Sequence, residues 1–287
     1  FDQYVKPKRN NLPKVLCSDE VHIKSNIKYP YACVLFDFHK SKIVDVLKTR
    51  RKEYLVSYFQ RFTISQLDCV KYVVMDLWAP YKNIVKDYLP NARIIADVFH
   101  FSRYVYWAFN DIRIRVMNLY DKNDIEYRML KKHWKIFLKS PTQLNKEYRY
   151  IPALNEHMND LMIHDYAANL HPDLEEAFRL KDYFQKGVKK TPFEEAETFI
   201  DTFISMLRNA KTKEFTEVKK TFSNWRTEII NSFDIHPITD KKMTNGPIEG
   251  INNFIKVIKR VSYGFRDFNR FRSRILYLYN KNYALIG

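Results

Sequence analysis

Three aspartates in this chain lie at or just after the ends of short, mostly apolar runs, and such runs commonly form buried strands. The aspartates are Asp19, Asp76 and Asp97, and the runs before them are 15–17, 72–75 and 93–96. We predict that each run is a strand of one sheet, with an acid at its end. Ligands of open sheets gather beyond the carboxyl ends of strands. A single aspartate often ends a strand for structural reasons alone, so it is the set of three that indicates a site.

A fourth acid, Glu249, lies in the predicted first turn of a helix. Asn245 and Gly246 are typical turn and N-cap residues, and Pro247 suits the first helical position. The positive end of the helix dipole favours a carboxylate there. Apolar residues with helical spacing follow and predict one buried face: Ile248, Ile251, Ile255 and Ile258. Taken alone, this pattern is explained by helix capping; beside the three aspartates, it offers a fourth carboxylate.

Carboxylates that cluster repel one another unless a cation neutralises them. Hard oxygen ligands select Mg²⁺ or Mn²⁺. Two such ions, roughly 3.5–4 Å apart, stabilise the attacking and leaving oxygens of a phosphoryl transfer. Such a cluster on a basic protein therefore indicates a metal-dependent nuclease or strand-transferase.

The elements that would position these acids alternate in a characteristic order. We expect strands at 15–17, 31–38, 42–47, 72–75 and 93–96, with helices at 51–62 and 81–88. Three consecutive strands followed by alternating helices and strands are typical of the ribonuclease-H-like fold. A doubly wound Rossmann fold would alternate from the start and would carry a glycine-rich loop after its first strand. The chain has only 5 glycines, and no such loop follows residue 17.

After residue 100 the apolar spacing becomes helical. We therefore predict an α/β fold: a ribonuclease-H-like mixed sheet with flanking helices, interrupted by a large all-helical insertion. The catalytic core would comprise 15–100 and 241–287, and the insertion 101–240. Residues 1–14 are polar and basic, and we interpret them as an arm or linker from an upstream domain. The chain begins with Phe1, as a fragment of a longer protein would.

The composition points to a polyanionic partner. The 287 residues carry a formal net charge of +16, and nucleic acid is the commonest partner of so basic a protein. Hydrophobic residues make up 46%, enough for a sizeable core, yet no apolar run approaches the ~20 residues that span a bilayer. Cys17, Cys33 and Cys69 form no C-x-x-C pair. Three such cysteines fit a reducing cytosol better than a disulfide framework.

Several stretches resemble the bacterial insertion-sequence transposases of the ISL-three family, and the similarity covers nearly the whole chain. The stretches are Ser18-Asp19-Glu20, the strand from Tyr31, Arg50-Arg51-Lys-Glu, Asp97-Val-Phe-His100, Asn245-Gly-Pro-Ile-Glu-Gly-Ile-Asn-Asn, Ile255-Lys-Val-Ile-Lys-Arg and Tyr263-Gly-Phe-Arg-Asp-Phe. The block around Glu249 is the most specific. The resemblance implies an Asp-Asp-Glu (DDE) catalytic domain with a ribonuclease-H-like core. It also implies an upstream zinc-finger and helix-turn-helix region, which lies outside this chain.

In this resemblance Asp19 matches the first acid and Glu249 the third, while either Asp76 or Asp97 could be the second. Topology favours Asp76, because the second acid of this fold follows the fourth strand. Asp97 with His100 then fits the C/D-x-x-H signature that related Mutator-like and hAT-like transposases place beyond their second aspartate. We therefore expect Asp19, Asp76 and Glu249 to hold two Mg²⁺ ions, for which Mn²⁺ can substitute, and Asp97 and His100 to support them.

The resemblance also implies partners and a setting. The substrate would be double-stranded DNA, at the element ends and at the target, in the bacterial cytoplasm. A homodimer or higher oligomer would assemble on that DNA. Basic residues of the last two helices are candidates for phosphate contacts: Lys256, Lys259, Arg260, Arg266, Arg270, Arg272 and Arg274. Two alternatives remain open: an inactive transposase-derived DNA-binding protein, and a ribonuclease-H-like nuclease without joining activity.

Overall fold

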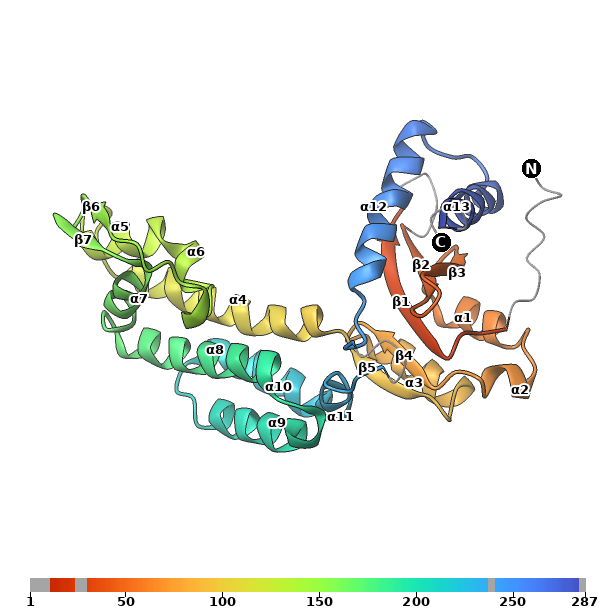
Figure 1. Cartoon of the computed structure of the whole chain (residues 1–287), viewed down its shortest axis with the longest axis horizontal. Coiled ribbons are helices and arrows are strands. Elements are labelled where there is room, and N and C mark those ends of the chain that lie inside the picture. Colours follow the sequence, from red (N-terminus) through yellow and green to blue (C-terminus); the bar gives the residue numbers. More distant parts are fainter. Residues whose placement is uncertain (1–10, 24–29, 237–240, 284–287) are drawn as a thin grey trace. The chain divides into compact units, whose positions relative to one another are not determined.

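The computed structural model of the chain describes residues 11–23, 30–236 and 241–283. The chain divides into two compact units, one made of 1–98 and 234–287 and the other of 99–233. The first unit is therefore assembled from two separate stretches of sequence (Figure 1). Most of the predicted arm, 1–10, lies outside the described residues, and Leu12 at its end is buried.

The first unit is built on a mixed sheet of five strands, counted over the described residues. They are β1 (Val15–His22), β2 (Tyr31–Asp37), β3 (Lys42–Leu47), β4 (Tyr72–Met75) and β5 (Arg93–Ala96). Their order across the sheet is β3-β2-β1-β4-β5. β2 pairs antiparallel with both β1 and β3, whereas β1, β4 and β5 run parallel. The five predicted strands are therefore confirmed, and the fold is mixed α/β.

The first strand is longer than predicted. We expected it to end before Asp19, but β1 continues to His22 because β2 pairs with it along that whole stretch, with Asp19 opposite Val34. The pairing between β1 and β4, in contrast, stops at Cys17. Asp19 therefore lies within its strand, just past the point where the neighbouring parallel strand ends.

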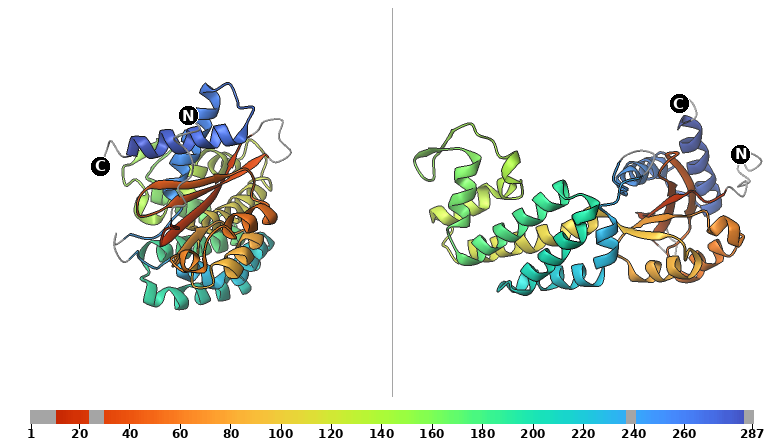
Figure 2. Two further views of the ribbon diagram at one scale, coloured as in Figure 1. Left: turned by 90° about the vertical axis from the view of Figure 1, so that its right-hand side faces the viewer. Right: turned by 60° about the horizontal axis from the view of Figure 1, so that its bottom comes forward.

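Helices cover both faces of this sheet (Figure 2). α1 (Lys52–Phe59) and α3 (Ala79–Tyr88) pack beside each other on one face, and the short α2 (Ile64–Leu67), which the sequence analysis did not foresee, follows α1. On the other face α12 (Gly246–Val261) packs against β1, and α13 (Phe268–Tyr283) against β3. Two stretches more than 140 residues apart in the sequence thus share one core.

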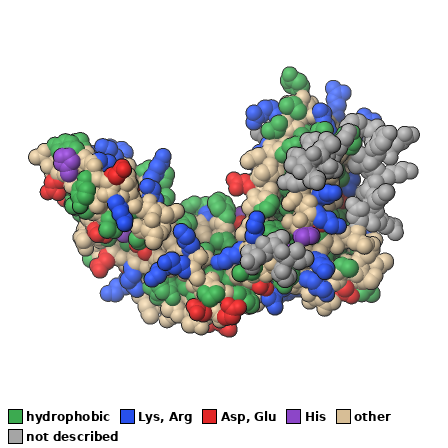
Figure 3. Space-filling view, viewed as in Figure 1, with side chains coloured by type: hydrophobic (Ala, Val, Ile, Leu, Met, Phe, Trp, Pro, Cys, Tyr) green, Lys and Arg blue, Asp and Glu red, His purple; other side chains and the backbone are tan. Residues whose placement is uncertain are grey.

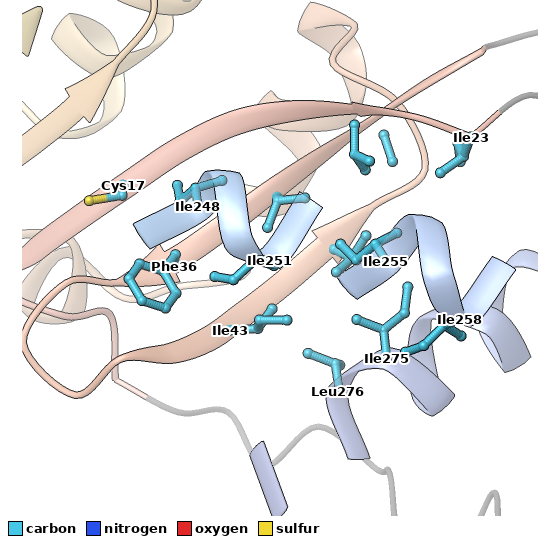
Figure 4. Close-up of a cluster of buried hydrophobic side chains, with 14 of the residues drawn as sticks. Cys17, Ile23, Phe36, Ile43, Ile248, Ile251, Ile255, Ile258, Ile275 and Leu276 are labelled. Atoms are coloured by element: carbon cyan, nitrogen blue, oxygen red, sulfur yellow. The ribbon is translucent and has the colours of Figure 1, made fainter. Parts of the chain in front are cut away.

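That core confirms the predicted apolar face of α12. Ile248, Ile251, Ile255 and Ile258 are all buried, and they face the sheet and α13 (Figure 4). The predicted helix start is also confirmed: Pro247 lies in the first turn and Glu249 follows it there. Burying isoleucine side chains contributes roughly 1.5–3 kcal/mol each, so this stripe fixes α12 firmly on β1.

The second unit is mainly helical. Its helices are α4 (Val98–Met117, which begins at the unit boundary), α5 (Ile125–Lys132), α6 (Trp134–Phe137), α7 (Asp160–Ala168), α8 (Pro172–Lys190), α9 (Phe193–Arg208), α10 (Thr216–Asn224) and α11 (Arg226–Asn231). Edge-to-face aromatic contacts join α4, α8, α9 and α10 at their centre, through Phe101, Phe184, Phe203 and Phe222. Such pairs contribute about 0.5–1.5 kcal/mol beyond the area they bury.

The prediction that residues 101–240 are all helical is wrong in one place. β6 (Arg149–Ile151) and β7 (Glu156–Met158) form an antiparallel hairpin. Its strands are only three residues long, too short to show an alternating pattern, and Asn155 takes up the left-handed backbone conformation in the turn. The unit boundaries, 98/99 and 233/234, also fall a few residues before the predicted ones.

None of the helices in the described residues combines the length and the apolar character needed to cross a membrane.

Candidate active site

Asp19 lies within β1, and Asp76 and Asp97 directly follow the neighbouring strands β4 and β5. The parallel pairing of β1 with β4 places Cys17 level with Val74. Asp19 comes two residues after Cys17 and Asp76 two residues after Val74, while Asp97 follows β5, which pairs in parallel with β4. The sheet therefore brings together three acids that are 57 and 21 positions apart in the sequence.

Two of these acids line the same pocket. Asp19 and Asp76 share it with Glu20, which follows Asp19 on β1. The pocket has a volume of about 20 Å³, enough for roughly one water molecule or bare ion. Side chains of α1 and α3 close its apolar side through Leu55 and Tyr81. The arrangement is a small acidic pocket at the carboxyl end of β4.

Hydrogen bonds hold the Asp19 carboxylate from two sides. Its Oδ1 accepts the Glu20 amide at 2.7 Å, and its Oδ2 accepts Nδ2 of Asn252 at 2.7 Å. Asn252 lies on α12 and is only 9% exposed. Its Nδ2 also lies 3.4 Å from the Glu20 carbonyl oxygen. Each carboxylate oxygen can accept more than one hydrogen bond.

Asp97 is more deeply buried, with 4% of its surface exposed. Its Oδ1 accepts the backbone amide of Asn245, the residue before α12, at 3.0 Å. Nδ2 of Asn245 in turn donates to the carbonyl oxygen of Ser18 at 2.9 Å. Asp97 is thus tied to the start of α12, and the same asparagine ties α12 to β1 just before Asp19.

Possible metal ligands also meet around Asp97. His100 follows three residues later in the first turn of α4. One ligand atom from each of Asp76, Asp97 and His100 lies within 4.8 Å of the other two. Within the described ranges this is the one such group of three among acids, histidines and cysteines, and it contains neither Asp19 nor Glu249. Asp76 therefore belongs both to this group and to the pocket with Asp19.

Glu249 lies in the first turn of α12, and its side chain is exposed. It stands one helical turn before Asn252, which reaches Asp19. Glu249 therefore lies on the helix that packs against β1, the strand of Asp19. The structure does not group the Glu249 carboxylate with the aspartates.

The neutral groups at the pocket are poor candidates for chemistry. Cys33 lines it, and burial raises the pKa of this thiol to about 12, an effect that a hydrogen bond from Ser18 only partly offsets. Burial likewise raises the pKa of the Tyr81 hydroxyl well above its usual range. Both groups stay protonated at neutral pH, which leaves the carboxyl groups as the candidate ligands of the pocket.

The basic residues proposed for DNA binding differ in their availability. Lys256, Arg260, Arg266, Arg270 and Arg274 are exposed, and Lys259 is half-buried. Lys and Arg side chains are prominent around α12 and α13 (Figure 3). Arg272 departs from the expectation: its guanidinium binds both carboxylate oxygens of the buried Asp45 on β3, at 2.5 and 2.8 Å. Arg272 therefore anchors α13 to the sheet.

Asn245 and Asn252 were missed in the sequence analysis as residues of the site. A usable signal was present, because both flank Glu249 and Asn252 interrupts the isoleucine stripe of α12. A buried polar residue in such a stripe needs a hydrogen-bond partner. The identity of that partner could not be inferred locally, since Asp19 lies 233 positions away.

An acidic pocket at the carboxyl edge of a mixed sheet, in a strongly basic protein, makes this chain a candidate enzyme acting on nucleic acid. Residues 16–275 match the DDE family of ISL-three type, described as transposase. The match covers most of the 287 residues, and the chain belongs to this transposase family.

A curated relative carries a different name. Over 135 residues the chain is 29% identical to a Lactococcus lactis subsp. lactis protein named "ATP-dependent protease". The matched segment spans 47% of this chain and 40% of that relative, so the chain covers less than half of the relative's length.

Proposed function

We propose that this chain is the catalytic domain of a DDE transposase, which cleaves DNA at the ends of an insertion sequence and joins it to a target. Membership of the transposase family supports a DNA-cutting and joining enzyme. The observation that carries the assignment of the site is the shared pocket of Asp19 and Asp76, of which Asp19 lies on β1 and Asp76 directly follows its parallel neighbour β4.

The donor set fits a hard divalent cation. Asp19 and Asp76 both line the pocket and carry carboxylate oxygens, which are the ligands that Mg²⁺ and Mn²⁺ prefer. In our proposal Asp19 and Asp76 hold the cations and Glu249 completes the set from α12. Divalent ions held by these acids would supply activation of the attacking oxygen and stabilisation of the leaving oxygen.

The chain's own residues would orient this set. Asn252 fixes one oxygen of Asp19, and the Glu20 amide fixes the other. Asp97 accepts the Asn245 amide and so holds the start of α12 against the sheet. This supports a positioning role for Asp97, with His100 beside it, and a ligand role for Asp76. We infer the same division of roles because Asp76 belongs both to the group with Asp97 and His100 and to the pocket with Asp19.

The fold is consistent with this proposal. A sheet ordered β3-β2-β1-β4-β5, with its first three strands antiparallel and the rest parallel, supports a ribonuclease-H-like core. We propose that 15–100 and 241–287 form this core and that 101–240 is an insertion without metal ligands. A homodimer or higher oligomer on double-stranded DNA in the bacterial cytoplasm remains part of the proposal.

The name of the Lactococcus relative does not alter this conclusion. ATP-dependent enzymes commonly bind phosphates with a G-x-x-x-x-G-K-[ST] loop. No such motif occurs in the 287 residues, where the glycines stand at 187, 246, 250, 264 and 287.

Two substitutions separate the candidate second acids. We expect Asp76→Asn to abolish Mn²⁺-dependent cleavage, because it removes a ligand. Asp97→Asn should leave measurable cleavage, reduced about 10–100-fold as for losses of supporting groups, since its amide oxygen can still accept the Asn245 amide. The assay is nicking and strand transfer of duplexes taken from both sides of the gene that encodes this chain.

Unchanged circular dichroism and DNA affinity in both variants would show that the losses are catalytic. A greater loss of cleavage in Asp97→Asn than in Asp76→Asn would assign the second ligand to Asp97. Binding without any nicking by the wild-type chain would indicate an inactive DNA-binding derivative, and nicking without joining a plain nuclease.

A further inference from the structure

One basic residue, Arg50, lines the acidic pocket together with the acids. Of the described residues that line it, three are acids, Asp19, Glu20 and Asp76, and Arg50 is the one base. Arg50 directly precedes Arg51 and α1 and lies outside the basic residues of α12 and α13 considered above. Carboxylates repel a phosphodiester, and a guanidinium fixed beside them attracts it.

The structure holds Arg50 in place on three sides. Its Nη1 donates to both carboxylate oxygens of Glu20, at 2.6 and 2.5 Å. The guanidinium carbon lies 5.4 Å from the ring centre of Tyr31 and 5.1 Å from that of Trp78. Cation–π contacts of this kind contribute about 0.5–1 kcal/mol each at exposed sites. Arg50 is therefore oriented before any ligand arrives.

The hydrogen bonds that the structure gives to the Arg50 side chain all come from Nη1. Its other nitrogens carry three further N–H groups, and the side chain is 40% exposed whereas Glu20 is 21% exposed. A guanidinium anchored by one nitrogen can still present a planar pair of donors, the geometry that binds phosphate oxygens in a bidentate manner.

We propose that Arg50 forms a phosphodiester-binding subsite at the rim of the pocket, which positions the DNA strand beside the proposed metal ligands. Glu20 and the rings of Tyr31 and Trp78 aim the guanidinium, and Glu20 takes no part as a metal ligand while Arg50 holds it. The ligand class is a phosphate of the DNA backbone. This inference rests on the proposed function, because the acids of the pocket define which phosphate Arg50 would meet.

Charge makes the inference testable without a cleavage assay. Arg50→Gln removes a cation from beside three carboxylates, so Mn²⁺ alone should bind as tightly as to wild type or more tightly. The same change should weaken DNA binding. A purely structural role for Arg50 would instead weaken both, since misplaced carboxylates bind a cation less well.

The experiment uses the whole chain as wild type, Arg50→Gln, Arg50→Lys and Arg51→Gln. Arg51 is exposed and does not line the pocket, so its variant is the control for net charge. Mn²⁺ binding is measured by calorimetry. Affinity for a short fluorescein-labelled duplex is measured by anisotropy across a series of salt concentrations in Mn²⁺.

For Arg50→Gln we expect the salt slope of DNA binding to fall by about one phosphate contact, with affinity about five- to tenfold lower in ~0.1 M salt. Arg50→Lys should keep the slope and lose part of the affinity, because it keeps the charge but not the planar fork. Arg51→Gln should match wild type.

Three results would overturn the subsite: an unchanged slope in Arg50→Gln, an equal loss in Arg51→Gln, or lost Mn²⁺ binding in Arg50→Gln. A wild-type chain that binds DNA through Arg50 but does not bind Mn²⁺ would refute the proposed function and leave the subsite standing.

Discussion

At the scale of single residues, the site depends on polar side chains that support the acids. Asn252 donates to Asp19 from the buried face of α12, so the first acid of the proposed set is oriented by the helix that carries the third. Groups that orient metal ligands typically contribute 10–100-fold to metal affinity or activity. Asn252 should therefore affect metal binding although its side chain is uncharged.

Asn252→Ala tests this role, with Asn253→Ala as its matched control. Asn253 is the next residue of the same helix and is exposed. We expect Asn252→Ala to weaken Mn²⁺ binding by about 10–100-fold, because Asp19 loses the donor on Oδ2, while Asn253→Ala binds Mn²⁺ like wild type. Calorimetric titration with Mn²⁺ is the measurement. Equal affinities in the two variants would contradict a positioning role for Asn252.

The acids could be predicted from sequence because their types and the apolar runs before them are local signals. Asp19, Asp76 and Asp97 were all singled out in this way, and the structure places them within β1 and directly after the neighbouring strands β4 and β5. Their supporting partners could not be predicted, since Asn245 meets Asp97 across 148 positions. Arg272 shows the same limit: its charge is visible in the sequence, but its pairing with Asp45 is not.

At the scale of elements, a strongly periodic helix could be predicted from the sequence, whereas very short strands and the end of a paired strand could not. The stripe of isoleucines on α12 predicted its buried face correctly. The end of β1 was misplaced because strand length there is set by the hairpin partner β2 and not by the apolar run. The hairpin of β6 and β7 was missed because strands of three residues leave no measurable pattern.

Close packing of α8 on α9 gives a prediction at this scale. A Cβ at Gly187 would come within 1.9 Å of the Phe199 ring, whereas one at Gly250 on α12 would meet nothing within 4 Å. We expect Gly187→Ala to lower the free energy of unfolding by about 1–3 kcal/mol through overpacking. Gly250→Ala should leave it unchanged or raise it by up to about 1 kcal/mol, because alanine favours helix.

Urea denaturation followed by circular dichroism measures both variants. A Gly187→Ala chain as stable as wild type would mean that the Phe199 ring moves aside without cost, and that α8 and α9 are less tightly packed than their contact indicates.

At the scale of the whole molecule, a long segment between β5 and α12 separates the two stretches that build the first unit. The chain leaves the first unit after residue 98 and re-enters it at residue 234. Asp97 and Asn245, which lie near these two crossings, are joined by a hydrogen bond at the site. The sheet and α12 therefore form one catalytic scaffold in our proposal, although 148 positions separate these two residues.

The net charge of +16 predicted a polyanionic partner, and family membership agrees with a DNA substrate. The sequence could not show which basic side chains form ion pairs within the protein. Arg115 and Arg226 form ion pairs within the second unit, and Arg272 does so in the first. Arg50 pairs with Glu20 at the acidic pocket. Where the charges lie, more than their sum, decides which of them meet DNA.

The most direct test of the proposed site is a crystal structure of this chain soaked in Mn²⁺, with the ion located by its anomalous scattering. We predict an anomalous peak in the pocket, bound by carboxylate oxygens of both Asp19 and Asp76. A peak held by Asp76, Asp97 and His100 and remote from Asp19, or no peak at these acids at saturating Mn²⁺, would contradict the proposed site.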